Sequence, residues 1–211
     1  MASTKITSVI TGDIIASQAI PNSIWLPRLK KVLSSAGKSP NTWQIYRGDS
    51  FQIEVKNPAD ALRVAIQIKA AIKTVKTLDV RMAIGIGNKA YNGSSVIESD
   101  GEAFVRSGQT FENLGKLKQT LAISSGWPEF DRDMNVFLRL ACIPMDEWST
   151  SSAELVLLLL NEKELTQEEV AKKLGVSQPA VSERQNRSHF DEITELERLY
   201  REKITSLTST K

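Results

Sequence analysis

The stretch TQEEVAKKLGVSQPAVSERQNR, residues 166–187, constrains the fold of this chain more than any other segment. Val170 and Leu174 supply the apolar inner face of a first helix. Gly175 permits the positive backbone angle that ends such a helix, and Ser177 is a good N-cap for a second one. This spacing predicts a helix-turn-helix, a motif that places its second helix in the major groove of DNA.

The second predicted helix carries the side chains that we expect to contact DNA. The candidates for base edges and phosphates are Gln178, Ser182, Arg184, Gln185 and Arg187. Arg184 departs from the motif, which usually places an apolar residue at that position. The alternative interpretation is that these residues form the solvated face of a helical bundle that contacts other proteins. Acidic neighbours oppose phosphate binding, but the specificity of the motif favours DNA as the partner.

Composition narrows the class of protein. The 211 residues are 41% hydrophobic and 25% charged, which is ordinary globular composition, and a net charge of +2 does not by itself indicate nucleic-acid binding. The longest apolar run, residues 155–160, is too short to cross a bilayer, and no N-terminal signal is visible. We therefore expect a cytoplasmic protein without membrane contact. The single cysteine, Cys142, is expected to be a small buried hydrophobe.

Strand and helix patterns alternate over the first 145 residues. The predicted strands are 5–11, 43–47, 51–55, 80–87 and 121–124, and the predicted helices are 23–36, 57–75, 102–116 and 128–142. The order β-α-β-β-α-β, with a further helix and strand, is that of the ferredoxin-like split βαβ arrangement. After Pro144 the sequence becomes polar and then entirely helical. An α+β chain is predicted, with a ferredoxin-like domain over residues 1–145 and a small all-α helix-turn-helix domain over 146–211.

Two of the predicted helices carry long apolar stripes. In the helix over 128–142 the side chains expected to point inward are Phe130, Met134, Phe137, Leu138 and Ala141. In a helix over 191–207 they are Ile193, Leu196, Tyr200, Ile204 and Leu207. We expect this last helix to close the helical domain over residues 155–160. The alternative is that it pairs with a second copy of itself, as in a DNA-binding homodimer.

Two aspartates stand at turns that the predicted topology brings together. Asp13 ends the first strand after Gly12, and Asp49 follows Gly48 at the tip of the predicted hairpin. In a split βαβ sheet this strand and this hairpin are neighbours, so the two carboxylates are expected to converge. Carboxylates close together suit Mg²⁺ on a triphosphate, although each aspartate alone is also a common turn residue.

Four nearby residues have two interpretations each. Arg47 and Arg81 could contact the phosphates of a nucleotide or be solvated strand residues. Gly85 and Gly87 share one face of the strand over 80–87, where they leave room for a ligand or, more ordinarily, for a packed helix.

Four segments carry a resemblance to a known family. GDIIAS at 12–17, GDSFQ at 48–52, VRMAIGIG at 80–87 and SDGEAF at 99–104 look like the SatD family. A C-terminal helix-turn-helix fits the same family, so the resemblance covers nearly the whole chain. The N-terminal part of the family is similar to the palm domain of class III nucleotidyl cyclases and diguanylate cyclases. The resemblance implies that Asp13 and Asp49 occupy the metal-binding positions of that palm.

The departures from the cyclase pattern bear on catalysis. Ser50 replaces the acidic residue usual after the hairpin aspartate, and Val105 and Gln109 stand where the resemblance places a transition-state asparagine and arginine. Neither can stabilise a pentavalent phosphorus by the usual contacts. Arg106 is one position away and faces about 100° elsewhere on a helix.

The leading hypothesis is a transcription-regulator-like protein. Its cyclase-like domain would sense a nucleotide with Mg²⁺, and its helix-turn-helix would bind DNA, since a ligand that favours one of two arrangements shifts the population. One alternative is a metal-dependent nucleotidyl cyclase or transferase acting on ATP or GTP, and another is a scaffold without ligand. Enzymatic activity is left open, with the lost helix residues weighing against it.

Overall fold

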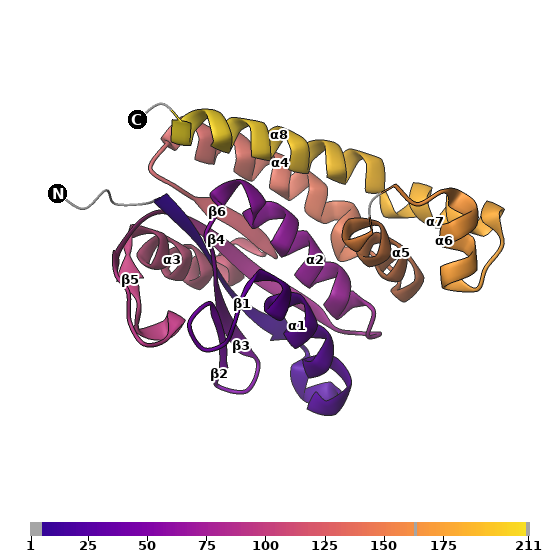
Figure 1. Ribbon diagram of the computed structural model, residues 1–211, viewed down its shortest axis with the longest axis horizontal. Coiled ribbons are helices and arrows are strands. Elements are labelled where there is room, and N and C mark those ends of the chain that lie inside the picture. The colour runs from indigo at the N-terminus through magenta and orange to yellow at the C-terminus, as the bar shows by residue number, and fades with distance from the viewer. Residues whose placement is uncertain (1–5, 163, 210–211) are drawn as a thin grey trace.

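The computed structural model describes residues 6–162 and 164–209, which form a mixed α/β molecule (Figure 1). Its strands are β1 (Ile6–Ile15), β2 (Trp43–Tyr46), β3 (Ser50–Val55), β4 (Asp79–Tyr91), β5 (Asp100–Gly101) and β6 (Leu121–Ser124). Its helices are α1 (Asn22–Ala36), α2 (Ala61–Lys73), α3 (Glu102–Leu117), α4 (Pro128–Asp146), α5 (Thr150–Asn161), α6 (Gln167–Leu174), α7 (Gln178–Ser188) and α8 (Phe190–Ser209). Three short 3₁₀ helices are η1 (Ser17–Ala19), η2 (Pro58–Asp60) and η3 (Val96–Glu98). None of the helices in the described ranges is both long enough and apolar enough to span a membrane.

The sheet is mainly antiparallel and has β1 near its centre. Its order is β2-β3-β1-β4, with β6 parallel to β4 and the short β5 paired with the far end of β4. The predicted elements are found, but β1 and β4 are longer than their sequence patterns indicate. They pair over ten residues, from Ile6 opposite Asn88 to Ile15 opposite Asp79. The backbone hydrogen bonds of this pairing keep both strands extended beyond the segments with an alternating pattern.

The two faces of the sheet are covered by different helices. Ile10 and Ile14 of β1 belong to the main core, which α1, α2, α4, α5 and α8 complete on one face. Val9 of β1 belongs to a smaller cluster with Ala103 and Phe104 of α3 on the other face. This layering follows from the strand period of two, which sends alternate side chains of β1 to opposite faces (Figure 1).

The glycines on the α3 face of β4 make room for that helix. A Cβ atom on Gly85 would lie 2.1 Å from the carbonyl oxygen of Ala103, and one on Gly87 would lie 2.6 Å from Cβ of Glu102. The packed-helix interpretation of these two glycines is therefore confirmed.

A buried cation joins α2, β4 and α4. The Nζ atom of Lys69, whose side chain is 1% exposed, lies 2.7 Å from Oδ1 of Asp79 and 2.6 Å from Oδ1 of Asp146. Burial alone lowers the pKa of Lys69, but the two carboxylates outweigh it and the net pKa is raised. Cys142 is buried nearby as expected, and burial raises the pKa of its thiol.

Helix α8 packs back onto the first half of the chain. Ile193, Tyr200 and Ile204 are buried in the main core, which also contains Leu160 of α5. The hydroxyl of Tyr200 donates to the carbonyl of Pro58 in η2 at 2.8 Å. The predicted apolar stripe of this helix is thus largely buried within its own chain, against residues from both halves.

Candidate functional sites

A polar cluster lies at one end of the sheet, where β1, β3 and β4 meet. Asp13 stands opposite Ser50 of β3 and opposite Arg81 of β4. The backbone N–H of Ile14 donates to the carbonyl of Asp49 at 3.3 Å, so the hairpin tip lies against β1. The strand pairing therefore brings the segments that carry the two predicted aspartates side by side.

Arg81 binds Asp13 through two nitrogen atoms. Its Nε donates to Oδ1 at 3.1 Å and its Nη2 donates to Oδ2 at 2.6 Å. The hydrogen bonds to Asp13 raise the pKa of Arg81 against the opposing effect of burial, and the negative charges of Asp13 and Asp49 add to the rise. Arg81 and Asp13 are thus in direct contact, and Asp49 lies near enough for its charge to act on Arg81.

The hairpin turn presents the second aspartate. Gly48 has a φ angle of 92°, which favours glycine, and Arg47 before it is exposed with a φ angle of 52°. The hydroxyl of Ser17 donates to Oδ2 of Asp49 at 2.5 Å. Arg47 forms no ion pair with any residue that the structure describes, whereas Arg81 is held by Asp13.

Two hydroxyl residues near these aspartates were not singled out by the sequence pattern: Ser17, which binds Asp49, and Tyr46. Ser17 lies in the segment GDIIAS, whose last residue carried no assigned role. Tyr46 precedes the turn, and burial raises the pKa of its phenol, with Arg47 opposing and Asp13 adding to the rise. A search for hydroxyl residues flanking each aspartate would have found both.

The cluster holds few metal ligands. No group of three or more histidine, cysteine or acidic residues gathers as a metal site in the ranges 6–162 and 164–209. Mg²⁺ is commonly bound through one or two carboxylates together with substrate phosphates. Both oxygens of Asp13 already accept hydrogen bonds from Arg81. A metal ion at Asp13 would therefore have to compete with Arg81 for this carboxylate.

Helix α3 presents no arginine at the positions that the cyclase resemblance implies. Val105 and Gln109 are exposed. Arg106 donates to the carbonyl of Ile86 at 2.6 Å and pairs with Glu102, so β4 and the helix itself hold its guanidinium.

A second candidate site is the unit of three short helices α5, α6 and α7. Leu155, Val170, Ala171 and Val181 form its own buried cluster. Gly175 ends α6 with a φ angle of 65°, as its position in the sequence predicts. The two residues that follow are the turn, and α7 then begins.

The N-termini of α6 and α7 are capped differently. Thr166 and Glu169 form a capping box at the start of α6, and the T-x-x-E pattern of residues 166–169 is its sequence signal. Ser177 is the N-cap residue of α7, as expected, but its side chain accepts no capping hydrogen bond.

Three of the predicted DNA contacts share one face of α7. Gln178, Ser182 and Gln185 follow the spacing i, i+4 and i+7. Gln178 is exposed and donates to Oε1 of Gln167 in α6 at 3.2 Å, and Gln185 donates to Asp191 at 2.9 Å.

The two arginines of α7 lie on a different side. Arg187 is nine positions after Gln178, which places it about 180° away around the helix axis. It pairs weakly with Glu183, at 3.6 Å, and lines a groove between α4 and α8. Arg184 is half-buried. The five predicted DNA contacts therefore do not form one surface.

The family model for the SatD family matches residues 7–195 of the chain. The match spans nearly the whole sheet, helices α1 to α7 and the first residues of α8. This chain belongs to the SatD family. Among curated proteins, no significant match is found.

Proposed function

We propose that this protein is a DNA-binding regulator whose sheet domain senses a nucleotide. The observation that carries the proposal is the α6–α7 arrangement: a capped helix, a left-handed Gly175, and a second helix on which Gln178 is exposed and Ser182 is half-buried. The buried cluster of α5, α6 and α7 supports a helix-turn-helix in which α7 is the recognition helix. Amide and hydroxyl side chains at its start suit hydrogen bonding to base edges.

The strand order supports a ferredoxin-like palm as the sensing domain. The elements β1-α1-β2-β3-α2-β4 follow the split βαβ sequence, and β1 lies between β3 and β4. The convergence of Asp13, Asp49 and Arg81 supplies two carboxylates and a cation at one end of this sheet. We infer that a nucleotide with Mg²⁺ binds here, with the carboxylates toward the metal and Arg81 toward phosphate.

A chain of contacts connects the two proposed sites. Strand β4, which carries the arginine of the cluster, begins at Asp79, and Asp79 shares Lys69 with Asp146 at the end of α4. Two residues later, the indole N–H of Trp148 donates to the carbonyl of Ser188 at the end of α7, at 2.8 Å. Coupling between the sites requires a ligand that binds two arrangements of the protein with different affinity. We infer that the two arrangements differ along this chain of contacts.

Replacing Arg81 with methionine tests the sensing site. Removing a charge-assisted contact to Asp13 is expected to tighten the binding of Mg²⁺ alone by roughly tenfold, because a hydrogen bond between charged groups contributes about 1.5–3 kcal/mol. The same variant is expected to weaken the binding of ATP or GTP, since the phosphate loses its cation. Isothermal titration with metal alone, and then with nucleotide, measures both effects.

The matched control is Arg132→Met, which removes an exposed arginine on α4. It should leave both affinities unchanged, and Asp13→Asn should abolish metal binding. If Arg81→Met and Asp13→Asn bind the metal as tightly as the unmodified protein does, the proposal that Mg²⁺ binds at Asp13 is overturned. Turnover of ATP or GTP that Asp49→Ala abolishes would favour the nucleotidyl cyclase or transferase instead.

The DNA-binding proposal is tested by selecting genomic fragments on the purified full chain and then substituting α7. We expect a recovered fragment to bind Gln178→Ala and Ser182→Ala more weakly by about 1–3 kcal/mol each, since each substitution removes a contact to a base edge. The control is Gln109→Ala, an exposed amide on α3. If both α7 variants bind the fragment as tightly as the wild type does, α7 is not the recognition helix.

A further inference from the structure

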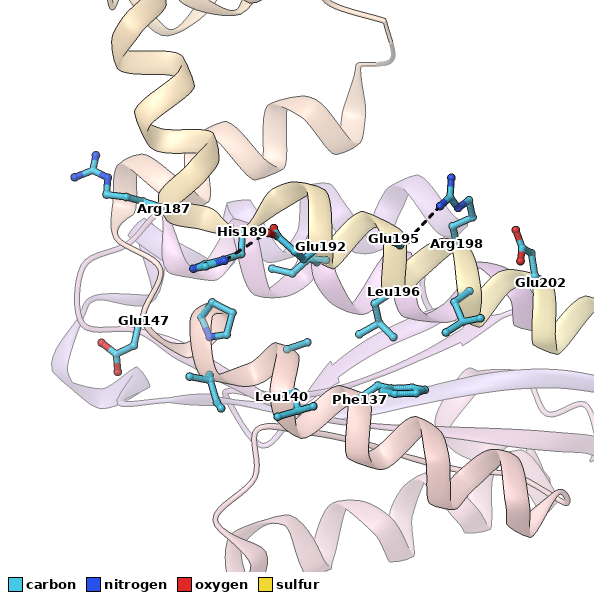
Figure 2. A pocket seen from close by; sticks show the side chains of 15 residues that line it. Phe137, Leu140, Glu147, Arg187, His189, Glu192, Glu195, Leu196, Arg198 and Glu202 are labelled. Atoms are coloured by element: carbon cyan, nitrogen blue, oxygen red, sulfur yellow. Dashed lines mark ion pairs between the residues drawn. The ribbon is translucent and has the colours of Figure 1, made fainter.

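A long groove runs between α4 and α8 on the surface of the molecule. It has a volume of about 1010 Å³, and its floor and walls are formed by apolar side chains of both helices (Figure 2). Figure 2 shows Leu196 of α8 facing Phe137 and Leu140 of α4 across it. A second hollow of about 480 Å³ continues between the same helices at their other ends, next to Phe130 and Leu207.

Helix α4 carries the densest group of large exposed hydrophobic side chains among the described residues, and Phe137, Leu140 and Ile143 of this group line the groove. Val136 is 40% exposed, Phe137 37%, Leu140 59% and Ile143 66%. These four lie within eight residues of one helix, whereas the other large exposed hydrophobic side chains of the described ranges are scattered over α1, β4, η3 and α3. A contiguous apolar patch with a charged rim is typical of a protein–protein contact.

The rim of the groove carries charges of both signs. Its cations pair only weakly within the chain: Arg198 lies 3.6 Å from Glu195, and the contact is exposed on both sides. Arg187 is similarly paired with Glu183. Glu147 and Glu202 on the same rim form no ion pair with any described residue.

The mixed charges of the rim favour a second copy of this chain as the occupant. A nucleic acid would meet the glutamates of the rim, and a partner of one sign would meet like charges somewhere along it. A second copy of the same surface presents both signs, and in a two-fold interface each contact from residue i to residue j is repeated from j to i. One arginine–glutamate contact across the axis therefore counts twice.

We propose that a second copy of this chain docks on the groove through its own α4 and α8, giving a symmetric dimer. The exposed ridge of Leu140 and Ile143 from each copy then fills the groove of the other, and four helices form the shared layer. Arg187, at the end of α7, borders this layer. The dimer consequently fixes the separation of two α7 helices, as in dimeric helix-turn-helix proteins that bind two DNA half-sites, and this last consequence rests on the proposed function.

The oligomeric state of the full chain tests this interface without any DNA. Sedimentation or light scattering from about 1 to 100 μM is expected to show a monomer–dimer equilibrium. Leu140→Glu and Ile143→Glu are expected to raise the dimer dissociation constant at least about tenfold. Because both side chains are already exposed in the monomer, circular dichroism melting should show a folded protein for each variant.

The matched control is Leu117→Glu, which places the same charge at a leucine 60% exposed on α3. It should leave the dimer intact. A wild-type protein that stays monomeric over this range would overturn the proposal and leave the groove to a different protein or an apolar ligand. A dimer that the α4 variants do not weaken would overturn it as well, because another surface would then form the contact.

Discussion

Gly85→Ala is expected to destabilise the protein by about 3 kcal/mol, the upper end of the usual cost of overpacking. The added Cβ would lie 2.1 Å from the carbonyl oxygen of Ala103 and 2.4 Å from the backbone nitrogen of Ser107. Both are backbone atoms of α3, so relief requires the whole helix to move off β4. Urea denaturation at equilibrium measures the loss.

Gly108→Ala is the matched substitution, because a Cβ there has no neighbour within 4 Å. Gly108 lies inside α3, where alanine is favoured over glycine by up to about 1 kcal/mol. The pair is therefore expected to change the free energy of unfolding in opposite directions. If Gly85→Ala costs nothing, α3 does not lie against β4 as the structure describes.

Lys69→Met is expected to cost about 3 kcal/mol, the lower end for removing one partner of a buried ion pair. Methionine preserves the apolar stem, but Asp79 and Asp146 lose their shared cation. The cost stays at the lower end because both carboxylates retain some contact with solvent, at 17% and 34% exposure.

The stability that Lys69 contributes through Asp79 and Asp146 depends on pH in a defined direction. Folding raises the pKa of Lys69 above its ordinary value of 10.5, so the pair stabilises the fold at neutral pH and that contribution is lost as pH rises through the raised pKa. The difference in the free energy of unfolding between the wild type and Lys69→Met should therefore become smaller in strong alkali. Lys30→Met, at an exposed position on α1, should change stability little. An equal effect of the two substitutions would contradict the buried network.

The order of elements could be predicted because apolar residues recur at two or at 3.6 positions along each segment. The same topology predicted that the segments of Asp13 and Asp49 meet. The partner of Arg81 could not be predicted, because it depends on the register of β4 against β1. That register places Arg81 directly opposite Asp13, where it forms an ion pair that neither interpretation of Arg81 had included.

The faces of the helices were harder to predict than their positions. In α4, Phe130, Met134 and Leu138 are buried as expected, but the expectation for Phe137 is wrong, since it is 37% exposed on the groove. One apolar stripe on α4 faces the core and another faces outward. Periodicity does not separate them, because only the placement of α8 decides which stripe is covered.

DNA recognition by α7 with a nucleotide-sensing sheet domain is tested most directly by one titration. A genomic fragment recovered with the full chain and a scrambled fragment of equal length are compared, each with and without nucleotide and Mg²⁺. We predict at least about 10³-fold tighter binding of the recovered fragment, and a change of about 5–150-fold in that affinity when nucleotide is added. Equal affinity for the two fragments under every condition would contradict the proposed function.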